Sequence, residues 1–329
     1  MNVYQKLEEL GILPVIHISK AEWAEPLAQA LTAGGIDALE VVFRSENAAE
    51  ILSTLKKNHP EMMIGAGTIL TIPQAEQALK AGADFIVNPG YDQKLVEFCL
   101  EKNAAILPGC TTASEIQAAY TSGLRVVKFF PAELSGGVSA IEAFAGPFAG
   151  MRFLPTGGIT LQNLDSYLRS SKVIACGGSF MVNEKLIDGS FMAPRAMLEQ
   201  GNFTAITELC RRAVQSSLGF ELAHVGINHA NEEEAEYSAK KIAALFALPL
   251  VEHTSSVFAG TAVECMKLPF YGEKGHIGFR TSSMTRAMAW LHGMGIELLE
   301  ESRKYDAKGN VICVYLKEKI AGFAIHIVA

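Results

Sequence analysis

The sequence lacks a basic excess and any long apolar run. Its 28 Lys and Arg stand against 35 Asp and Glu, a formal net charge of -7, so it has no electrostatic footprint for nucleic acid or an anionic membrane surface. No apolar run reaches the length of a membrane span. Residues 1–10 have the pattern of a short amphipathic helix and not of a signal peptide. We therefore expect a cytoplasmic protein that has neither nucleic acid nor a membrane as a partner.

Cysteine is scarce and scattered as well. The six cysteines include no C-x-x-C pair, so the sequence indicates neither a disulfide framework nor a zinc knuckle, and reduced thiols are the simplest interpretation. What the chain does have is apolar material, because 49% of its 329 residues are hydrophobic and only 19% are charged. This length and composition favour two globular domains over one core.

Short apolar segments alternate with helix-like segments through the first two thirds of the chain. The expected strands are residues 12–18, 38–44, 63–68, 85–88, 105–107, 126–130, 152–154 and 173–175. Each is followed by a helical pattern, the last over about residues 203–214, and glycine or proline ends most of these helices. Short apolar strands separated by helices are typical of a parallel sheet covered by helices. Eight such units favour an α/β fold of the closed (β/α)8 barrel type over an open doubly wound sheet.

One expected strand contains a lysine within an apolar run, at residues 125–133 (RVVKFFPAE). Val126, Lys128 and Phe130 share one face of this strand because strand side chains alternate with period two. A buried ammonium group is unfavourable, so such a lysine reaches solvent, pairs with an acid or becomes neutral. A neutral amine in an apolar pocket attacks carbonyls to form a Schiff base. Taken alone, a lysine whose amino group lies in water at a strand end is the commoner case.

The other strand ends favour a catalytic interpretation, because the active site of a (β/α)8 barrel lies at the carboxyl ends of its strands. Glu40 and Arg44 share the inner face of the second expected strand, and Thr68 ends the third. Glycine-rich turns follow the seventh and eighth strands, at residues 155–158 and 177–179. Each turn alone is explained by simple turn chemistry, but two adjacent turns at this corner predict a phosphate site.

These segments together resemble the 2-keto-3-deoxy-6-phosphogluconate (KDPG) / 4-hydroxy-2-oxoglutarate (KHG) aldolases, class I enzymes of bacterial sugar-acid metabolism. The resemblance covers about residues 1–215, through LEVVFR, IGAGT, VNPG, ILPG, VVKFFPAE, AGPFAGMRFLPTGGI and ACGGSF in this order. It implies a Schiff-base aldolase that cleaves KDPG to pyruvate and glyceraldehyde 3-phosphate, needs no cofactor for this step and forms a homotrimer.

The resemblance also implies roles for individual residues. Lys128 would add to the C2 carbonyl of the 2-keto acid, and Glu40 would exchange protons with the substrate. Arg44 and Thr68 would hold the carboxylate of the pyruvyl part. The remaining expected substrate-binding residues are Pro89, Thr156, Gly157, Gly158, Gly178 and Ser179. Two other substrates remain open, namely unphosphorylated KHG, which yields pyruvate and glyoxylate, and the 6-phosphogalactonate series. A metabolite-binding sensor with an inactive barrel is the non-enzyme alternative.

The last third, residues 216–329, is expected to form an added domain after a short polar linker at 215–219. Residues 224–227 (HVGI) recur as 276–279 (HIGF). Each copy is followed by a helical pattern, at 232–248 and 284–293, and then by three strand-like runs. Two such βαβββ units make a smaller α+β domain that resembles the vicinal oxygen chelate fold of glyoxalases and extradiol dioxygenases.

This second resemblance implies a divalent metal site with ligands from the first and last strands of each unit. Those positions are His224, Glu264, His276 and His326. Imidazole and carboxylate ligands suit Zn²⁺, Mn²⁺ or Fe²⁺. The family more often has glutamate at the position of His326. The alternative interpretation is that these histidines are packing residues in a small core and bind no metal.

Overall fold

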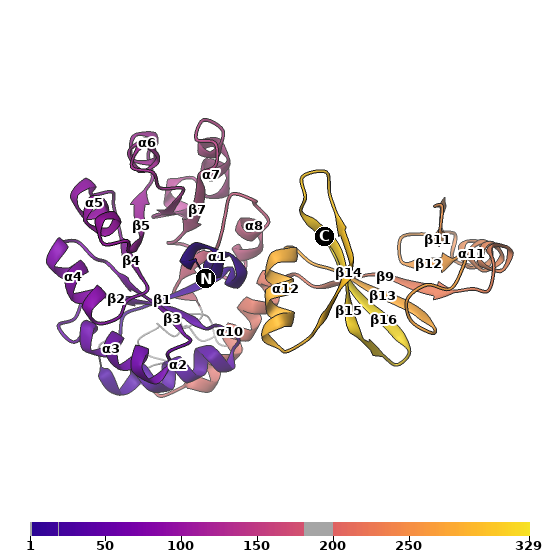
Figure 1. Ribbon diagram of the computed structural model, residues 1–329, viewed down its shortest axis with the longest axis horizontal. Coiled ribbons are helices and arrows are strands. Elements are labelled where there is room, and N and C mark those ends of the chain that lie inside the picture. The colour runs from indigo at the N-terminus through magenta and orange to yellow at the C-terminus, as the bar shows by residue number, and fades with distance from the viewer. Residues whose placement is uncertain (1, 19, 181–199) are drawn as a thin grey trace. The chain divides into compact units, whose positions relative to one another are not determined.

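The computed structural model describes residues 2–18, 20–180 and 200–329 (Figure 1). The chain divides into two compact units, Met1–Ser217 and Leu218–Ala329. No helix within the described ranges is long and apolar enough to cross a bilayer.

The first unit is a barrel of eight parallel strands, in the order β7-β6-β5-β4-β3-β2-β1-β8. The strands are β1 Ile12–Ile16, β2 Ala38–Val42, β3 Met63–Gly67, β4 Phe85–Asn88, β5 Ala105–Cys110, β6 Val126–Phe129, β7 Arg152–Pro155 and β8 Cys176–Gly178. Bridges between Phe153 and Val173 and between Thr156 and Gly177 join β7 to the segment that contains β8. The predicted (β/α)8 barrel is therefore confirmed.

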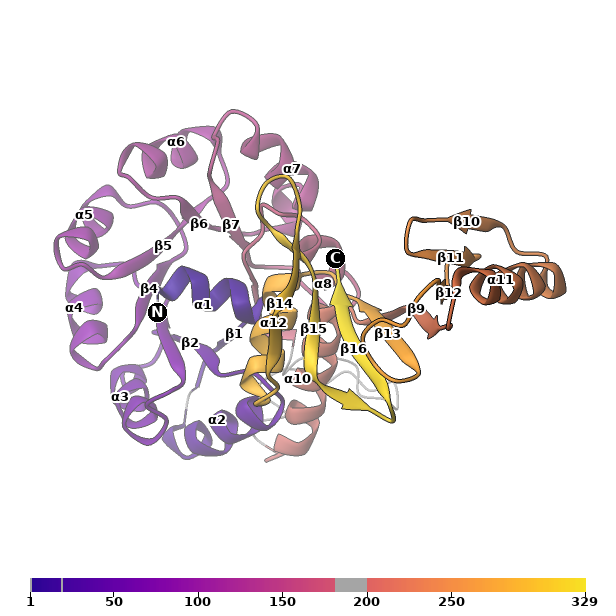
Figure 2. The ribbon, with the colours of Figure 1, turned by 45° about the vertical axis from the view of Figure 1, so that its right-hand side comes forward.

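Helices surround this ring of strands, except for the first, which lies over the middle of the ring in Figure 2. They are α1 Val3–Leu10, α2 Ala24–Ala33, α3 Ala48–Asn58, α4 Ile72–Lys80, α5 Gln93–Glu101, α6 Ala113–Thr121, α7 Gly137–Ala145, α8 Leu164–Leu168 and α10 Phe203–Leu218, with 3-10 turns η1 Ala21–Trp23 and η2 Glu133–Ser135. The residues Thr112 and Glu115 form a capping box, which satisfies free amides at the start of α6.

The core of the barrel is formed by apolar residues of α1 and of the strands. Leu7 of α1 is fully buried in one cluster with Leu13, Phe85 and Leu107 of the strands. Because α1 leads directly into β1, it covers the amino-terminal end of the barrel. The carboxyl ends of the strands, where the predicted catalytic residues lie, are at the opposite end of the barrel from α1.

Two expectations about element positions are wrong. The eighth strand is Cys176–Gly178 and not 173–175, because residues 176–178 pair with 12–14 of β1, while Val173 makes only an isolated bridge. Gly177 and Gly178, which suggested a turn, belong to this strand instead. The expected linker at 215–219 is helical through Leu218: Ser217 Oγ donates to the carbonyl of Val214, and the helix ends before Gly219 with its φ of 56°.

The second unit contains the two predicted βαβββ repeats in one eight-stranded sheet. The first repeat is β9 Glu221–Asn228, α11 Glu232–Phe246, β10 Leu250–Glu252, β11 Ser256–Ala259 and β12 Val263–Met266; the second is β13 Gly275–Arg280, α12 Met284–Gly293, β14 Leu298–Tyr305, β15 Val311–Ile320 and β16 Phe323–Val328. Asn231 caps α11, and three glutamates in its first turn complement the helix dipole.

The sheet order β10-β11-β12-β9-β13-β16-β15-β14 places the first strands of the two repeats side by side. Within each repeat the first strand pairs in parallel with the last, β9 with β12 and β13 with β16. Between the repeats, β9 and β13 are antiparallel. The first and last strands of both repeats therefore meet at the centre of the sheet.

Candidate active site and candidate metal centre

A buried lysine and a buried carboxylate face each other inside the barrel. Lys128 Nζ of β6 lies 3.3 Å from Glu40 Oε1 of β2. Lys128 is 6% exposed and Glu40 1%. Gly67 of β3 makes space for this carboxylate, because a side-chain carbon at Gly67 would lie 2.0 Å from Glu40 Oε1. Such a pair can pass a proton between amine and carboxylate without solvent.

Three buried polar atoms near the carboxyl ends of the strands have no hydrogen-bond partner among the described residues. They are Glu40 Oε2, Asn88 Oδ1 and Thr156 Oγ1. Buried polar atoms are almost always paired, so unpaired ones call for a ligand or water as their partner. Asn88 was missed from the sequence, although it stands next to the predicted Pro89 at the end of β4.

The predicted carboxylate-binding residues lie just beyond their strands. Thr68 follows β3 and has a φ of 59°, an uncommon conformation for a β-branched residue. Arg44 lies two residues beyond β2, is exposed, and forms no ion pair with any described residue. The structure does not bring Arg44 into contact with Lys128, but it leaves the guanidinium available to an anion.

In the turn after β7, the backbone carbonyls accept hydrogen bonds, while the amides of two glycines have no acceptor among the described residues. Ala132 N donates to the carbonyl of Thr156, Glu133 N to that of Gly157, and Asn163 Nδ2 to that of Gly158. Gly157 and Gly158 have φ values of 94° and 83°, and in the described part of the chain their amides have no acceptor. Oriented amides of this kind bind anions. Gly178 ends β8 and the half-buried Ser179 follows it, next to this turn in the ring of strands.

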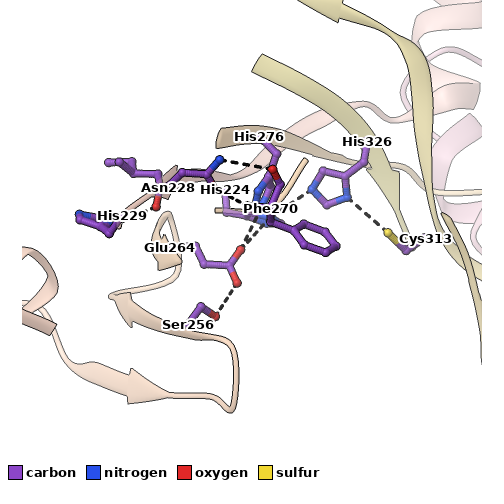
Figure 3. A network of polar contacts seen from close by, with 10 residues as sticks. His224, Asn228, His229, Ser256, Glu264, Phe270, His276, Cys313 and His326 are labelled. Atoms are coloured by element: carbon purple, nitrogen blue, oxygen red, sulfur yellow. Dashed lines mark hydrogen bonds and ion pairs between the residues drawn. The ribbon is translucent and has the colours of Figure 1, made fainter. Parts of the chain in front are cut away.

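The four predicted metal ligands of the second unit lie in one cluster (Figure 3). Donor atoms of His224, His276 and His326 all lie within 4.8 Å of one another, and Glu264 contacts two of these histidines. His224 Nε2 lies 3.2 Å from His276 Nε2 and 3.1 Å from His326 Nε2. Glu264 Oε2 lies 3.0 Å from His276 Nε2 and 3.5 Å from His224 Nε2. Adjacent imidazole nitrogens cannot both direct a proton at each other, so free lone pairs point into the cluster.

The pKa values of His326, His224 and Glu264 are all lowered, which favours the protonation states that bind a cation. Burial, together with the neighbouring His276 and His224, lowers the pKa of His326 to about 3. Burial also lowers the pKa of His224, against the opposing attraction of Glu264. Burial alone would raise the pKa of Glu264, but hydrogen bonds from His276 and Ser256 outweigh it and lower the pKa. Neutral imidazoles and an ionised carboxylate are the forms that ligate metal ions.

A second layer of contacts holds the donors. Ser256 Oγ donates to Glu264 Oε1 at 2.6 Å, and Cys313 Sγ lies 3.4 Å from His326 Nδ1. The ring of Tyr315 stacks on that of His326, with centroids 4.5 Å apart and planes at 12°. These supports could not be predicted from the sequence, because they depend on the register between β11 and β12 and between β15 and β16.

Comparison with known proteins identifies the first unit. A family model described as "KDPG and KHG aldolase" matches residues 3–209. The 2-dehydro-3-deoxy-phosphogluconate aldolase of Treponema pallidum is 41% identical over 215 residues, which make up 65% of this chain and 97% of the relative.

Two solved structures are similar over the same part of the chain. The KDPG aldolase of Legionella pneumophila, with pyruvate captured as a covalent carbinolamine intermediate, is 34% identical, with a TM-score of 0.59 over 64% of this chain and 97% of that one. The KDPG aldolase of Zymomonas mobilis with 3-phosphoglycerate is also 34% identical, with a TM-score of 0.57 over 65% of this chain and 95% of that one. This chain therefore belongs, through its barrel, to the KDPG and KHG aldolase family of class I aldolases.

Proposed function

We propose that residues 1–215 form a Schiff-base aldolase domain that cleaves KDPG to pyruvate and glyceraldehyde 3-phosphate. The observation that carries the proposal is the contact of Lys128 Nζ with Glu40 Oε1, buried inside the barrel at 3.3 Å. The family membership supports the same reaction class.

The reaction begins when the amine of Lys128 adds to the C2 carbonyl and water leaves, which gives an iminium ion. The C4 hydroxyl then gives its proton to Glu40, the C3–C4 bond breaks, and its electrons move into the iminium to form an enamine. Glyceraldehyde 3-phosphate departs, Glu40 returns the proton to C3, and water releases pyruvate. Acid–base help of this kind is worth roughly 10²–10⁴-fold. No metal is needed for this step, because the iminium is the electron sink.

Binding groups at the strand ends would orient the substrate. Arg44 and Thr68 would hold the carboxylate, since a guanidinium that has no ion pair among the described residues is suited to a fork-shaped ion pair. The free amides of Gly157 and Gly158, with Gly178 and Ser179, would hold the distal phosphate. Pro89 and Thr156 would line the space between these two ends.

The test is a pyruvate-release assay over KDPG, KHG and the 6-phosphogalactonate analogue. We expect a higher kcat/KM for KDPG than for unphosphorylated KHG, because the amides after β7 favour a phosphate. Lys94→Ala, which changes an exposed lysine of α5, should leave release unchanged, while Lys128→Ala should abolish it. Equal kcat/KM for KHG would favour the unphosphorylated substrate, and no release from any of the three would favour the sensor alternative.

We further propose that residues 216–329 form a domain of the vicinal oxygen chelate type that binds one divalent cation. His224, Glu264, His276 and His326 would hold it, since each donor atom lies 3.0 or 3.1 Å from its nearest neighbour in the cluster. Three imidazoles and one carboxylate are donors suited to Zn²⁺, Mn²⁺ or Fe²⁺. A cation bound there would act as a Lewis acid toward an oxygen ligand. Elemental analysis of the purified protein should find about one metal per chain.

Membership of this family also supports a homotrimer. The proposed small-molecule partner is the substrate, a 2-keto-3-deoxy acid. A cytoplasmic location suits an enzyme of sugar-acid metabolism. Light scattering of the full-length protein tests the assembly, and a monomeric mass at working concentration would contradict it.

A further inference from the structure

The repeated His-x-Gly sequence places each histidine opposite the glycine of the other repeat. In the antiparallel pair of β9 and β13, His276 is the register partner of Gly226, and Gly278 is the register partner of His224. On their other sides, Gly226 pairs with Glu264 of β12 and Gly278 pairs with His326 of β16. The four converging donors are therefore the strand neighbours of two glycines.

Any side chain on these glycines would occupy the space of the donors. A carbon added at Gly226 would lie 2.1 Å from His276 Cε1 and 2.4 Å from its Nε2. One added at Gly278 would lie 2.6 Å from His326 Nε2 and 2.7 Å from His224 Cε1. These contacts are too short to be relieved by small shifts, because His276 and His326 are 2% and 4% exposed and packed on all sides.

We propose that Gly226 and Gly278 are positioning residues that allow the two repeats to build one shared cation site. Each repeat supplies a histidine to the site and, two residues later, a glycine that leaves space for the donors of neighbouring strands. Neither half completes the site alone. The inference rests on the proposed cation binding of this domain, and it explains why glycine stands two residues after the histidine in both copies.

The two glycines are not equivalent. Gly226 makes space chiefly for the ring of His276, while Gly278 lies against the rings of both His224 and His326. An added methyl group at Gly278 therefore displaces two of the four donors, and one at Gly226 displaces one. We expect the Gly278 variant to lose more affinity for the cation.

The first experiment measures Zn²⁺ affinity of the full-length protein by competition with a chromophoric chelator, and records the visible spectrum of the Co²⁺ form. Gly226→Ala should weaken Zn²⁺ binding by about 10- to 100-fold, the range found when the support of a ligand is lost, and Gly278→Ala should weaken it further. Gly293→Ala is the matched control, because an added carbon there meets nothing within 4 Å. His224→Ala/His276→Ala sets the baseline without the site.

A second experiment reports on the geometry without any metal. In the metal-free protein, Gly226→Ala should lower Tm more in the wild-type background than in a His276→Ala background, since the smaller residue removes the contact. If the wild type binds the cation and both glycine variants bind it equally well, the role of the glycines is overturned but the proposed cation binding is not. Equal Tm losses in the two backgrounds would have the same consequence. A wild type that binds no better than the double-histidine variant would overturn the proposed cation binding itself.

Discussion

The two candidate sites of this chain are built on opposite principles. In the barrel, the reactive group belongs to the chain: a buried amine contacts a buried carboxylate at 3.3 Å. In the second unit, three imidazoles and a carboxylate converge with no amine among them, and we propose that their lone pairs bind a cation. The first arrangement can make and break a covalent bond unaided. The second can only present donors to something else.

This difference implies that the two sites can be disabled separately. The proposed ligands of the second unit come from β9, β12, β13 and β16, and none of them lies within the barrel. The following predictions test whether the barrel site works without a cation and whether the second site needs one.

The largest effect is expected from Lys128→Ala. We expect kcat for KDPG cleavage to fall by at least about 10³-fold, because alanine has no amine that could form the covalent intermediate. Zn²⁺ uptake by the second unit should not change. Cleavage that persists at near wild-type rate would show that Lys128 is not the nucleophile.

The next largest effect is expected from Glu40→Gln. This change keeps the shape of the side chain but removes its ability to carry a proton, so kcat should fall by roughly 10²–10⁴-fold. Pyruvate should still form a reducible adduct with Lys128. Thermal unfolding serves as the control, because removing the acid leaves a buried lysine unpaired. A variant that unfolds normally and cleaves KDPG at full rate would remove Glu40 from the mechanism.

A smaller effect is expected from Thr156→Val, which removes a buried hydroxyl that lacks a partner among the described residues. Valine has nearly the same shape, so the loss should appear as about a 10-fold lower kcat/KM, the value of one hydrogen bond to substrate. Steady-state kinetics with KDPG measures it. An unchanged kcat/KM would mean that this hydroxyl does not contact the substrate.

The sequence could predict residue types at strand ends but not every neighbour in space. Glu40 and Lys128 were placed on inner strand faces by period two alone, although closure of the ring is what brings them together from β2 and β6. The eighth strand was misplaced because glycines that pair with β1 look the same as glycines in a turn.

In the second unit, the resemblance to the vicinal oxygen chelate fold implied four donors on the first and last strands of the two repeats, and these strands are paired in both repeats. What the repeat could not reveal was the reciprocal packing of Gly226 and Gly278, because it exists only once β9 and β13 are paired. Cys313 was likewise missed, since its contact with His326 crosses from β15 to β16.

The smallest effect is expected from Cys313→Ala. The thiol contacts His326 Nδ1, and when that nitrogen carries the proton, Nε2 is left free to bind a cation. Losing this support should weaken Zn²⁺ binding by up to about 10-fold, while Cys313→Ser should retain most of the affinity. Chelator competition measures both variants, and equal affinities of wild type and Cys313→Ala would show that the contact has no such role. Aldolase activity should be the same in all three proteins.

The most direct test of the central claim is borohydride reduction of the full-length protein in the presence of pyruvate and a metal chelator, followed by peptide mass spectrometry. The account predicts one pyruvyl adduct per chain, located on Lys128, and the same adduct in His224→Ala/His276→Ala. An adduct on a different lysine, or an adduct that the chelator prevents, would contradict it.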